Sequence, residues 1–272
     1  MKVICLFFTA LVFSAGGINA QQVNPINAPV GGSIEQIVAF YNQHANTVKS
    51  VERVTITKNS AREVDMHIPV LLRPFVPNNM MESLRNNSTR VTETFVNGIG
   101  TGDTAHRLND FLPVAGTPNV SYLSASHVIS ATCIRRGSDL VVTIILRNEP
   151  LDTIFDTTQT NSRGVENMSE AERETLMADI LSRSGYVSSM DLQFDDMQDT
   201  EDTQQSNAAN RSPSSMSGGF QDGAITAVFN QEGRLLSLTH SYNMNMSFRV
   251  LLMTARINIA SRRDYQFIYP MF

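Results

Sequence analysis

The stretch LLSLTHSYNMNMSF, residues 235–248, decides the predicted fold. From Leu236 onward, every second residue belongs to a mostly apolar series that includes two methionines, and the residues between them are serine, threonine or asparagine. Since successive side chains of a β-strand point to opposite faces, this alternation predicts one long strand with an apolar face and a polar face. The predicted apolar face consists of Leu236, Leu238, His240, Tyr242, Met244 and Met246.

The length of this strand predicts a curved sheet. Residues 234–247 would span roughly 46 Å at ~3.3 Å per residue, whereas common strands contain about five or six residues. A sheet of such strands cannot stay flat, because the twist of each strand accumulates. We therefore predict an α+β fold, in which a strongly curved, half-barrel-like antiparallel β-sheet carries two or three helices packed on one face.

Further strands are indicated by β-branched and apolar runs that end in turn residues. The hairpin 127–136 with 140–147 is the clearest, because Gly137, Ser138 and Asp139 supply its turn. The run 140–147 is apolar on both faces, which predicts a central strand covered on both sides. The other predicted strands are 51–58 paired with 62–69, then 89–98, 224–230, 250–260 and 264–270, with a bend at Arg262–Arg263.

Two helices are predicted to fill the concave face of the sheet. Each begins with a capping-box pattern, in which a serine is followed three residues later by glutamine or glutamate. Ser33 with Gln36 opens the helix 33–49, and Ser169 with Glu172 opens the helix 169–183. Both helices then show apolar residues at helical spacing, and Gly185 ends the second.

The N-terminus predicts secretion. Residues 1–20, MKVICLFFTALVFSAGGINA, have the charged start, apolar middle and small-residue end of a signal peptide. Their apolar run is too short for a membrane helix of about 20 residues, and no later stretch is long enough, so we expect no membrane span. Residues 21–32 are predicted to be a linker, and 33–272 a single α+β domain.

Charge is concentrated in one segment. Residues 188–222 carry seven acidic side chains and one arginine, a net charge of 1 − 7 = −6, and they lack periodicity. This composition predicts a disordered acidic insertion within the domain. Removal of Lys2 with the signal peptide changes the chain from −5 to −6, so the remainder is neutral and nucleic acid is not an expected partner.

The sequence shows no legible catalytic, metal or cofactor motif. The five histidines form no metal-ligand spacing, and no nucleophile motif is present, although a Ser-His-Asp set assembled from distant positions stays open. Cys133 is the one cysteine left after signal cleavage; it is either a buried strand residue or a thiol for pairing between chains or for reaction. Six glycosylation sequons would matter in a eukaryote: Asn86, Asn87, Asn119, Asn167, Asn210 and Asn245.

The methionines on the predicted concave face raise two alternatives. Methionine adapts to irregular shapes, and the chain has 13 of them and no tryptophan, so the face either cradles an apolar ligand or is an awkward core beneath the helices. Similarly, His240 is either a hydrogen-bonded core residue or a residue that contacts a ligand or takes part in catalysis. The candidate ligand-binding residues are Leu236, Leu238, His240, Tyr242, Met244, Met246 and Met253.

Three phrases carry a resemblance to a known group: FYNQHANTVK (40–49), LNDFLPVAGTPNVSYLSASHVISATC (108–133) and GAITAVFNQEGRLLSLTH (223–240). Together they resemble uncharacterised secreted or lipid-anchored proteins of gut clostridia. The matching positions are Tyr41, Asn42, Ala45, Asn46, Val48 and Lys49, then Val120, Ser121, Leu123, Val128, Ala131, Thr132 and Cys133. The resemblance implies an extracellular module without a known activity; this chain departs from it in lacking an anchor cysteine and in the acidic insertion.

The sequence therefore favours a secreted, non-enzymatic binding module whose concave face holds a hydrophobic ligand, an apolar small molecule. The alternative is an extracellular interaction or structural module at a cell surface or matrix, which would bind an extracellular protein. A hydrolase without a legible motif is the third alternative.

Overall fold

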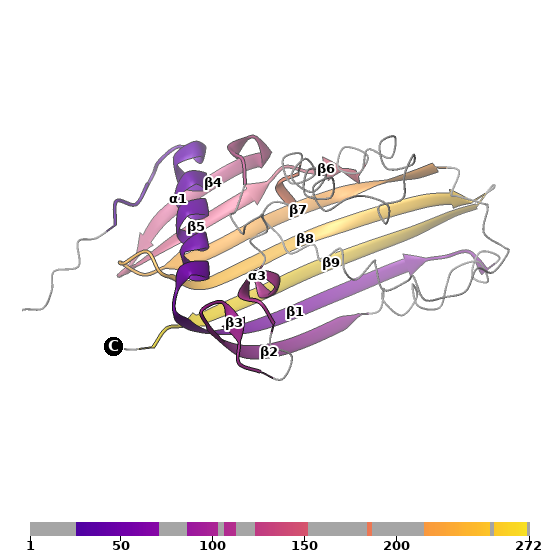
Figure 1. The fold of residues 1–272 in the computed structure, drawn as a ribbon. Coiled ribbons are helices and arrows are strands. Elements are labelled where there is room, and N and C mark those ends of the chain that lie inside the picture. The colour runs from indigo at the N-terminus through magenta and orange to yellow at the C-terminus, as the bar shows by residue number, and fades with distance from the viewer. Residues whose placement is uncertain are drawn as a thin grey trace, which may run out of the picture.

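The computed structural model describes residues 26–70, 86–102, 106–112, 123–151, 184–186, 215–250 and 253–270. These residues form a nine-stranded antiparallel sheet in the order β3-β2-β1-β9-β8-β7-β5-β4, with β6 paired to β7 (Figure 1). The strands are β1 Arg53–His67, β2 Asn87–Val96, β3 Ile99–Gly100, β4 Val128–Arg136, β5 Asp139–Leu146, β6 Glu149–Pro150, β7 Ser215–Phe229, β8 Leu235–Val250 and β9 Met253–Ile268. The helices are α1 Ile34–Thr47, η1 Val48–Ser50, α3 Leu108–Phe111 and η3 Ala125–His127.

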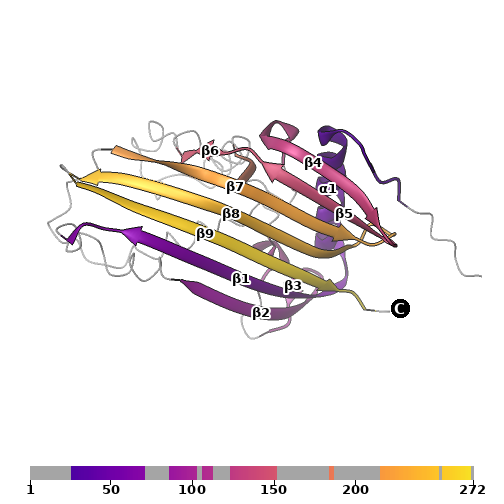
Figure 2. The same cartoon turned by 180° about the vertical axis from the view of Figure 1, so that it is seen from behind.

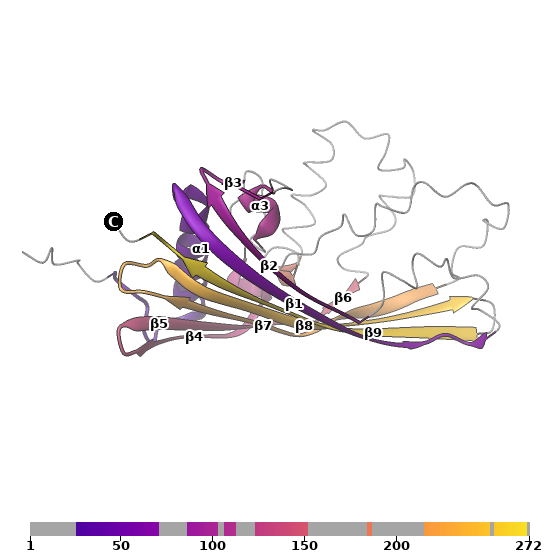
Figure 3. The same cartoon turned by 90° about the horizontal axis from the view of Figure 1, so that it is seen from below.

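The long-strand prediction is confirmed. β8 and β9 contain 16 residues each, and β1 and β7 contain 15 each. The sheet is open, because β3 and β4 stand at opposite ends of the strand order. Seen from below, its strands are strongly twisted across the sheet, and α1 and α3 lie on one side of it (Figure 3).

Two predicted breaks in the strands are wrong. The pair 51–58 and 62–69 is one continuous strand, β1, and β9 runs through Arg262–Arg263 without ending. β1 and β9 pair with each other; in addition, β1 pairs with β2 and β9 pairs with β8. The ladder hydrogen bonds on both sides hold the extended backbone where the local sequence indicated a turn.

β7 begins earlier than the sequence indicated. It starts at Ser215, so residues 215–222, predicted to belong to the disordered acidic insertion, are strand residues; 188–214 lie outside the described residues. A register shift between Gln221 and Ala224 accommodates the polar residues there as a β-bulge, in which Asp222 has a φ of 54°. Pairing with β8 along this length overrides the local composition.

α1 is the one described helix longer than a single turn, so the expected two or three helices are not all found; 169–183 lies outside the described residues. Its capping box is present as predicted: the Ser33 hydroxyl accepts from the Gln36 N–H, and the Gln36 side chain accepts from the Ser33 N–H. Its apolar stripe packs on the sheet, where Ile37, Val38, Phe40, Tyr41 and Ala45 are buried.

The hairpin prediction is confirmed by the pairing of β4 with β5. β5 also pairs with β7, so it is an internal strand, although it lies next to the edge strand β4 rather than at the centre of the sheet. The predicted linker packs more closely than expected: Ile26 and Ala28 contact the main core, and the Gly31 N–H donates to the Cys133 carbonyl. Residues 21–25 lie outside the described residues.

Candidate ligand-binding face

The face of the sheet that α1 covers, here called the inner face, is the candidate site. Strand alternation places Leu238, His240, Tyr242, Met244 and Met246 on this face of β8. Leu236 departs from the prediction, because a register shift beside Phe229 brings Leu235 opposite that ring. Leu235 is therefore buried and Leu236 only half-buried.

The part of the inner face beneath α1 is a closed core. Phe40 and His44 of α1 contact the ring of Phe229, whose side chain is fully buried. Leu238 and Ala227, paired across β7 and β8, are also fully buried. Side chains therefore occupy the space between this helix and the sheet.

His240 lies within this core as a hydrogen-bonded residue. It is 2% exposed, and its Nε2 lies 3.4 Å from the Tyr41 hydroxyl of α1. Its Nδ1 has no hydrogen-bond partner among the described atoms. Burial, with the nearby charge of Arg263 as a second cause, lowers the pKa of His240 to about 3, so the imidazole is neutral. This geometry favours the core alternative over the ligand contact.

The far part of the inner face differs from the part beneath α1. Met244, Met246 and Met253 are only half-buried there, as are Met66 and Phe248. Their neighbours on β9, Ala255 and Ile257, are fully buried. We call these five half-buried residues the methionine region; their adaptable apolar side chains stay partly accessible beside fully buried neighbours.

A polar band crosses the inner face between the core and the methionine region. Lys58 and Arg62 of β1 alternate with the same period as the buried Ile56, so both share its face, and Arg263 of β9 is paired with Ser60 between them. These side chains line a hollow of about 320 Å³, which we call the cationic hollow. Its lining is Lys58, Ser60, Ala61, Arg62, Asn87, Thr89, Val91, His106, Phe111, Ser261 and Arg263.

Two further contacts shape the cationic hollow. The Lys58 ammonium lies 5.4 Å from the ring centre of Phe111 and 5.6 Å from that of Tyr265, within cation–π range. His106 Nδ1 lies 2.7 Å from a carboxylate oxygen of Glu93, which is itself buried. The surroundings of the hollow thus combine cations, hydroxyls and aromatic rings.

The opposite, outer face of the sheet carries no described α-helix (Figure 2). It mixes polar side chains with exposed apolar ones such as Ile134 and Ile268. Thr132, Thr143, Thr226 and Thr239 are paired in succession across β4, β5, β7 and β8, so four threonines form one row. A second hollow, of about 550 Å³, lies further along and is lined mainly by outer-face amides and carboxylates. Its lining is Glu63, Val64, Asp65, Asn86, Gln221, Asn243, Met244, Asn245, Asn258, Ile259 and Ala260.

Three of the six sequons lie within the described residues. Asn86 and Asn87 are exposed beside the start of β2, and Asn245 is half-buried on the outer face. The Asn86 side-chain oxygen already accepts the Val64 N–H at 2.6 Å. Asn119, Asn167 and Asn210 lie outside the described residues.

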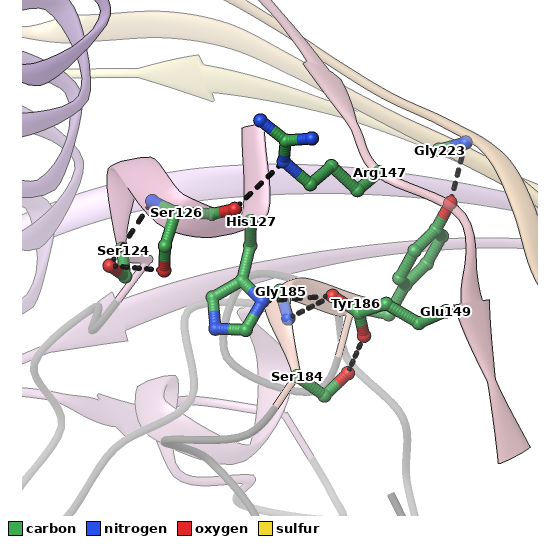
Figure 4. A network of polar contacts seen from close by, with 9 residues as sticks. All are labelled: Ser124, Ser126, His127, Arg147, Glu149, Ser184, Gly185, Tyr186 and Gly223. Carbon is green, nitrogen blue, oxygen red and sulfur yellow. Dashed lines mark hydrogen bonds and ion pairs between the residues drawn. The ribbon is translucent and has the colours of Figure 1, made fainter. Parts of the chain in front are cut away.

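A histidine, a carboxylate and a serine meet at Glu149 (Figure 4). The Ser184 hydroxyl donates to Glu149 Oε2 at 2.5 Å, while His127 Nδ1 lies 3.0 Å from Oε1, which also accepts the Gly185 N–H at 2.9 Å. The carboxylate therefore lies between the hydroxyl and the imidazole. A nucleophilic serine needs its hydroxyl on the imidazole, so this arrangement favours a structural clamp that holds residues 184–186 against β6.

Cys133 is buried on β4, as one of the two alternatives predicted. Burial raises the pKa of its thiol, against a smaller opposing effect of the Arg135 charge. Within the described ranges, no three His, Cys, Asp or Glu side chains are grouped to hold a metal ion. The described helices are also too short or too polar to cross a lipid bilayer.

Comparison with protein-family models, with curated proteins and with solved structures found no match to this chain. The site must therefore be judged on its own geometry. Sequence reasoning missed the polar band, because its members come from separate strands. The signal that could have revealed it lies in β1. Lys58 and Arg62 follow Ile56 at even spacings, so strand alternation places all three side chains on the same face.

Proposed function

We propose that the protein is a secreted, non-enzymatic binding module that holds a hydrophobic ligand on the methionine region of its inner face. The observation that carries the proposal is the contrast along β8. Leu238 and His240 are buried beneath α1, whereas Met244 and Met246 on the same face are half-buried. The two parts of one strand face thus differ in how far their apolar side chains are open to contact.

The chemistry of the methionine region suits an apolar ligand of variable shape. Methionine is unbranched and polarizable, so it repacks around different partners with little strain. Each methylene group that a ligand buries contributes about 0.8 kcal/mol.

Secretion is part of the proposal. It is supported by the signal-peptide pattern of residues 1–20 and by the resemblance to secreted or lipid-anchored clostridial proteins. The non-enzymatic part is supported by the arrangement at Glu149, where the carboxylate separates Ser184 from His127.

A titration with a fluorescent apolar probe tests the proposal. Met244→Asp places a charge on the inner face and should weaken probe binding at least about tenfold, because burying a carboxylate in an apolar contact is costly. Met244→Leu should bind like the wild type. Ser247→Asp is the matched charge control, since Ser247 lies on the outer face three residues away, opposite Arg256.

The melting temperature of each variant shows whether a loss of binding reflects unfolding. Wild-type protein that binds no apolar probe would contradict the proposal. So would a folded Met244→Asp variant with unchanged affinity.

A second candidate, an extracellular interaction or structural module, is favoured by the row of threonines on the outer face. Four hydroxyl side chains in register across four strands give a regular row of hydrogen-bond donors and acceptors that another macromolecule can contact. Thr226→Lys would then abolish attachment to cell-surface or matrix preparations and leave apolar-probe binding intact. Retained attachment would remove this candidate.

A further inference from the structure

We infer that the outer face of the sheet carries a second binding site, which takes a carbohydrate without acidic groups. The site is the hollow of about 550 Å³ beside Asn243, Asn245 and Asn258, here called the outer hollow. Its polar side chains lie on the face opposite the methionine side chains of β8. The inference therefore goes beyond the proposed function and does not depend on it.

One row of polar side chains crosses the outer hollow through direct strand pairing. Asn245 of β8 pairs with Asn258 of β9, and Asn258 pairs with Asp65 of β1. Side chains at paired positions of neighbouring strands have Cβ atoms about 4.5–5.5 Å apart. Three adjacent strands therefore contribute two carboxamides and a carboxylate to one hollow.

A second row lies two residues further along the same strands. Asn243 of β8 pairs with Ala260 of β9, and Ala260 pairs with Glu63 of β1. Because the side chain of Ala260 is short, it leaves a small apolar floor between two longer polar side chains. Such a surface matches a sugar ring, which has C–H groups on its faces and hydroxyl groups around its rim.

The side chains of the first row are available to a ligand. Among the described residues, the side chains of Asp65, Asn245 and Asn258 make no hydrogen bond, whereas Asn243 donates to Asp222 at 2.9 Å. Asparagine is depleted in strands, yet Asn245 and Asn258 belong to internal strands that are paired on both sides. A departure from local propensity that no internal hydrogen bond offsets is typical of functional sites.

The donors and acceptors of the outer hollow select the class of ligand. A carboxamide both donates and accepts and a carboxylate accepts, which suits hydroxyl groups that donate and accept. A metal cation would use only the oxygens and leave the amide N–H groups without a role. An acidic ligand is disfavoured, because the described lining contains Glu63 and Asp65 and no lysine or arginine.

A glycan microarray tests the inference, with protein from a bacterial host so that the sequons at Asn86 and Asn245 stay unmodified. We expect binding to a subset of the neutral oligosaccharides and none to acidic ones. Binding should persist in EDTA, because the side chains contact the sugar without a bridging cation. Absence of binding to every neutral oligosaccharide would overturn the inference, as would binding that is lost in EDTA or confined to acidic glycans.

Calorimetric titration with the neutral glycan bound best on the array locates the site. In Asn245→Val/Asn258→Val, its affinity should fall at least about tenfold, because two hydrogen-bonding groups are lost. The melting temperature should not fall, since valine favours strands more than asparagine does. Gln266→Val is the matched control and should bind the glycan like the wild type, because Gln266 is an exposed carboxamide of the outer face of β9, eight residues from Asn258.

If the double variant fails to fold, Asp65→Ala serves instead, since Asp65 is exposed, and it should also weaken glycan binding at least about tenfold. Unchanged glycan affinity in the folded variant would overturn the inference. The fluorescent apolar probe separates this result from the proposed function, because each variant should bind that probe like the wild type. Loss of both ligands together would indicate one shared site and would also overturn the inference.

Discussion

The buried imidazole of His240 predicts a specific loss of stability in acid. The folded chain holds it neutral against the Tyr41 hydroxyl, with a pKa of about 3. In the unfolded chain the pKa of a histidine is about 6.5. Between these two values the unfolded chain binds one more proton at this residue than the folded chain. The free energy of unfolding therefore rises with pH across this window and falls on acidification.

The magnitude follows from the two pKa values. Well below pH 6.5, each pH unit removes about 1.4 kcal/mol, because one proton separates the two states. From pH 7 to pH 5, His240 alone should lower the free energy of unfolding by about 2 kcal/mol. Burial also lowers the pKa of His44, which adds an effect of the same sign, but that effect is shared by wild type and variants.

Urea unfolding of wild type, His240→Gln and Tyr41→Phe at pH 7 and pH 5 measures this effect. His240→Gln should lose about 2 kcal/mol less than the wild type on acidification. Tyr41→Phe is the control: it loses about 1 kcal/mol at both pH values through the missing hydroxyl and keeps the wild-type pH dependence. If His240→Gln shows the same acid loss as the wild type, the imidazole is not held neutral in the core.

Three further outcomes are expected. Phe229→Ala leaves a cavity beneath α1 and should lower the free energy of unfolding by about 3–5 kcal/mol, whereas Met246→Ala, which truncates a half-buried side chain, should cost less than about 2 kcal/mol in urea unfolding; a loss at Met246 typical of a fully buried methionine, about 2–5 kcal/mol, would contradict the two-part face. Glu149→Gln weakens the bonds from Ser184 and Gly185, and hydrogen exchange at Gly185 should accelerate; unchanged exchange would rule out the clamp. Gly218→Ala should lower the melting temperature, because its φ is 153° and a Cβ would overlap the Asn245 carbonyl; an unchanged value would contradict this geometry.

The parts of the fold with local signals could be predicted from the sequence. Ser33 with Gln36 marks the start of α1 because the capping box is made within four residues. The turn at Gly137 places the β4–β5 hairpin because glycine accepts its φ of 61°. The alternation of apolar and polar residues along β8 can be read from the sequence of that strand alone, without knowledge of the strands that pair with it.

The parts that depend on neighbouring strands could not be predicted in this way. Ser60 and Arg262 lie in polar stretches typical of turns, yet pairing on both sides keeps β1 and β9 extended. Leu235 lies in the core in place of the predicted Leu236 because the pairing register shifts opposite Phe229. Such shifts are set by two strands together, so one strand's sequence does not reveal them.

The candidate site was predicted in part for the same reason. The residues of β8 were visible as one face, but the polar band joins Lys58 to Arg263, about 200 positions apart along the chain, through the β1–β9 register. The contacts of Glu149 likewise join residues 127, 149 and 184. Only the folded sheet brings these groups together.

Methyl-carbon NMR of protein labelled at methionine, titrated with oleate, tests the central claim most directly. The account predicts that the signals of Met244, Met246 and Met253 shift with one saturating dissociation constant. It also predicts that the shifts are lost in Met244→Asp. Saturation of oleate binding, seen by calorimetry, with these three signals unmoved would contradict the claim that the ligand lies on this face.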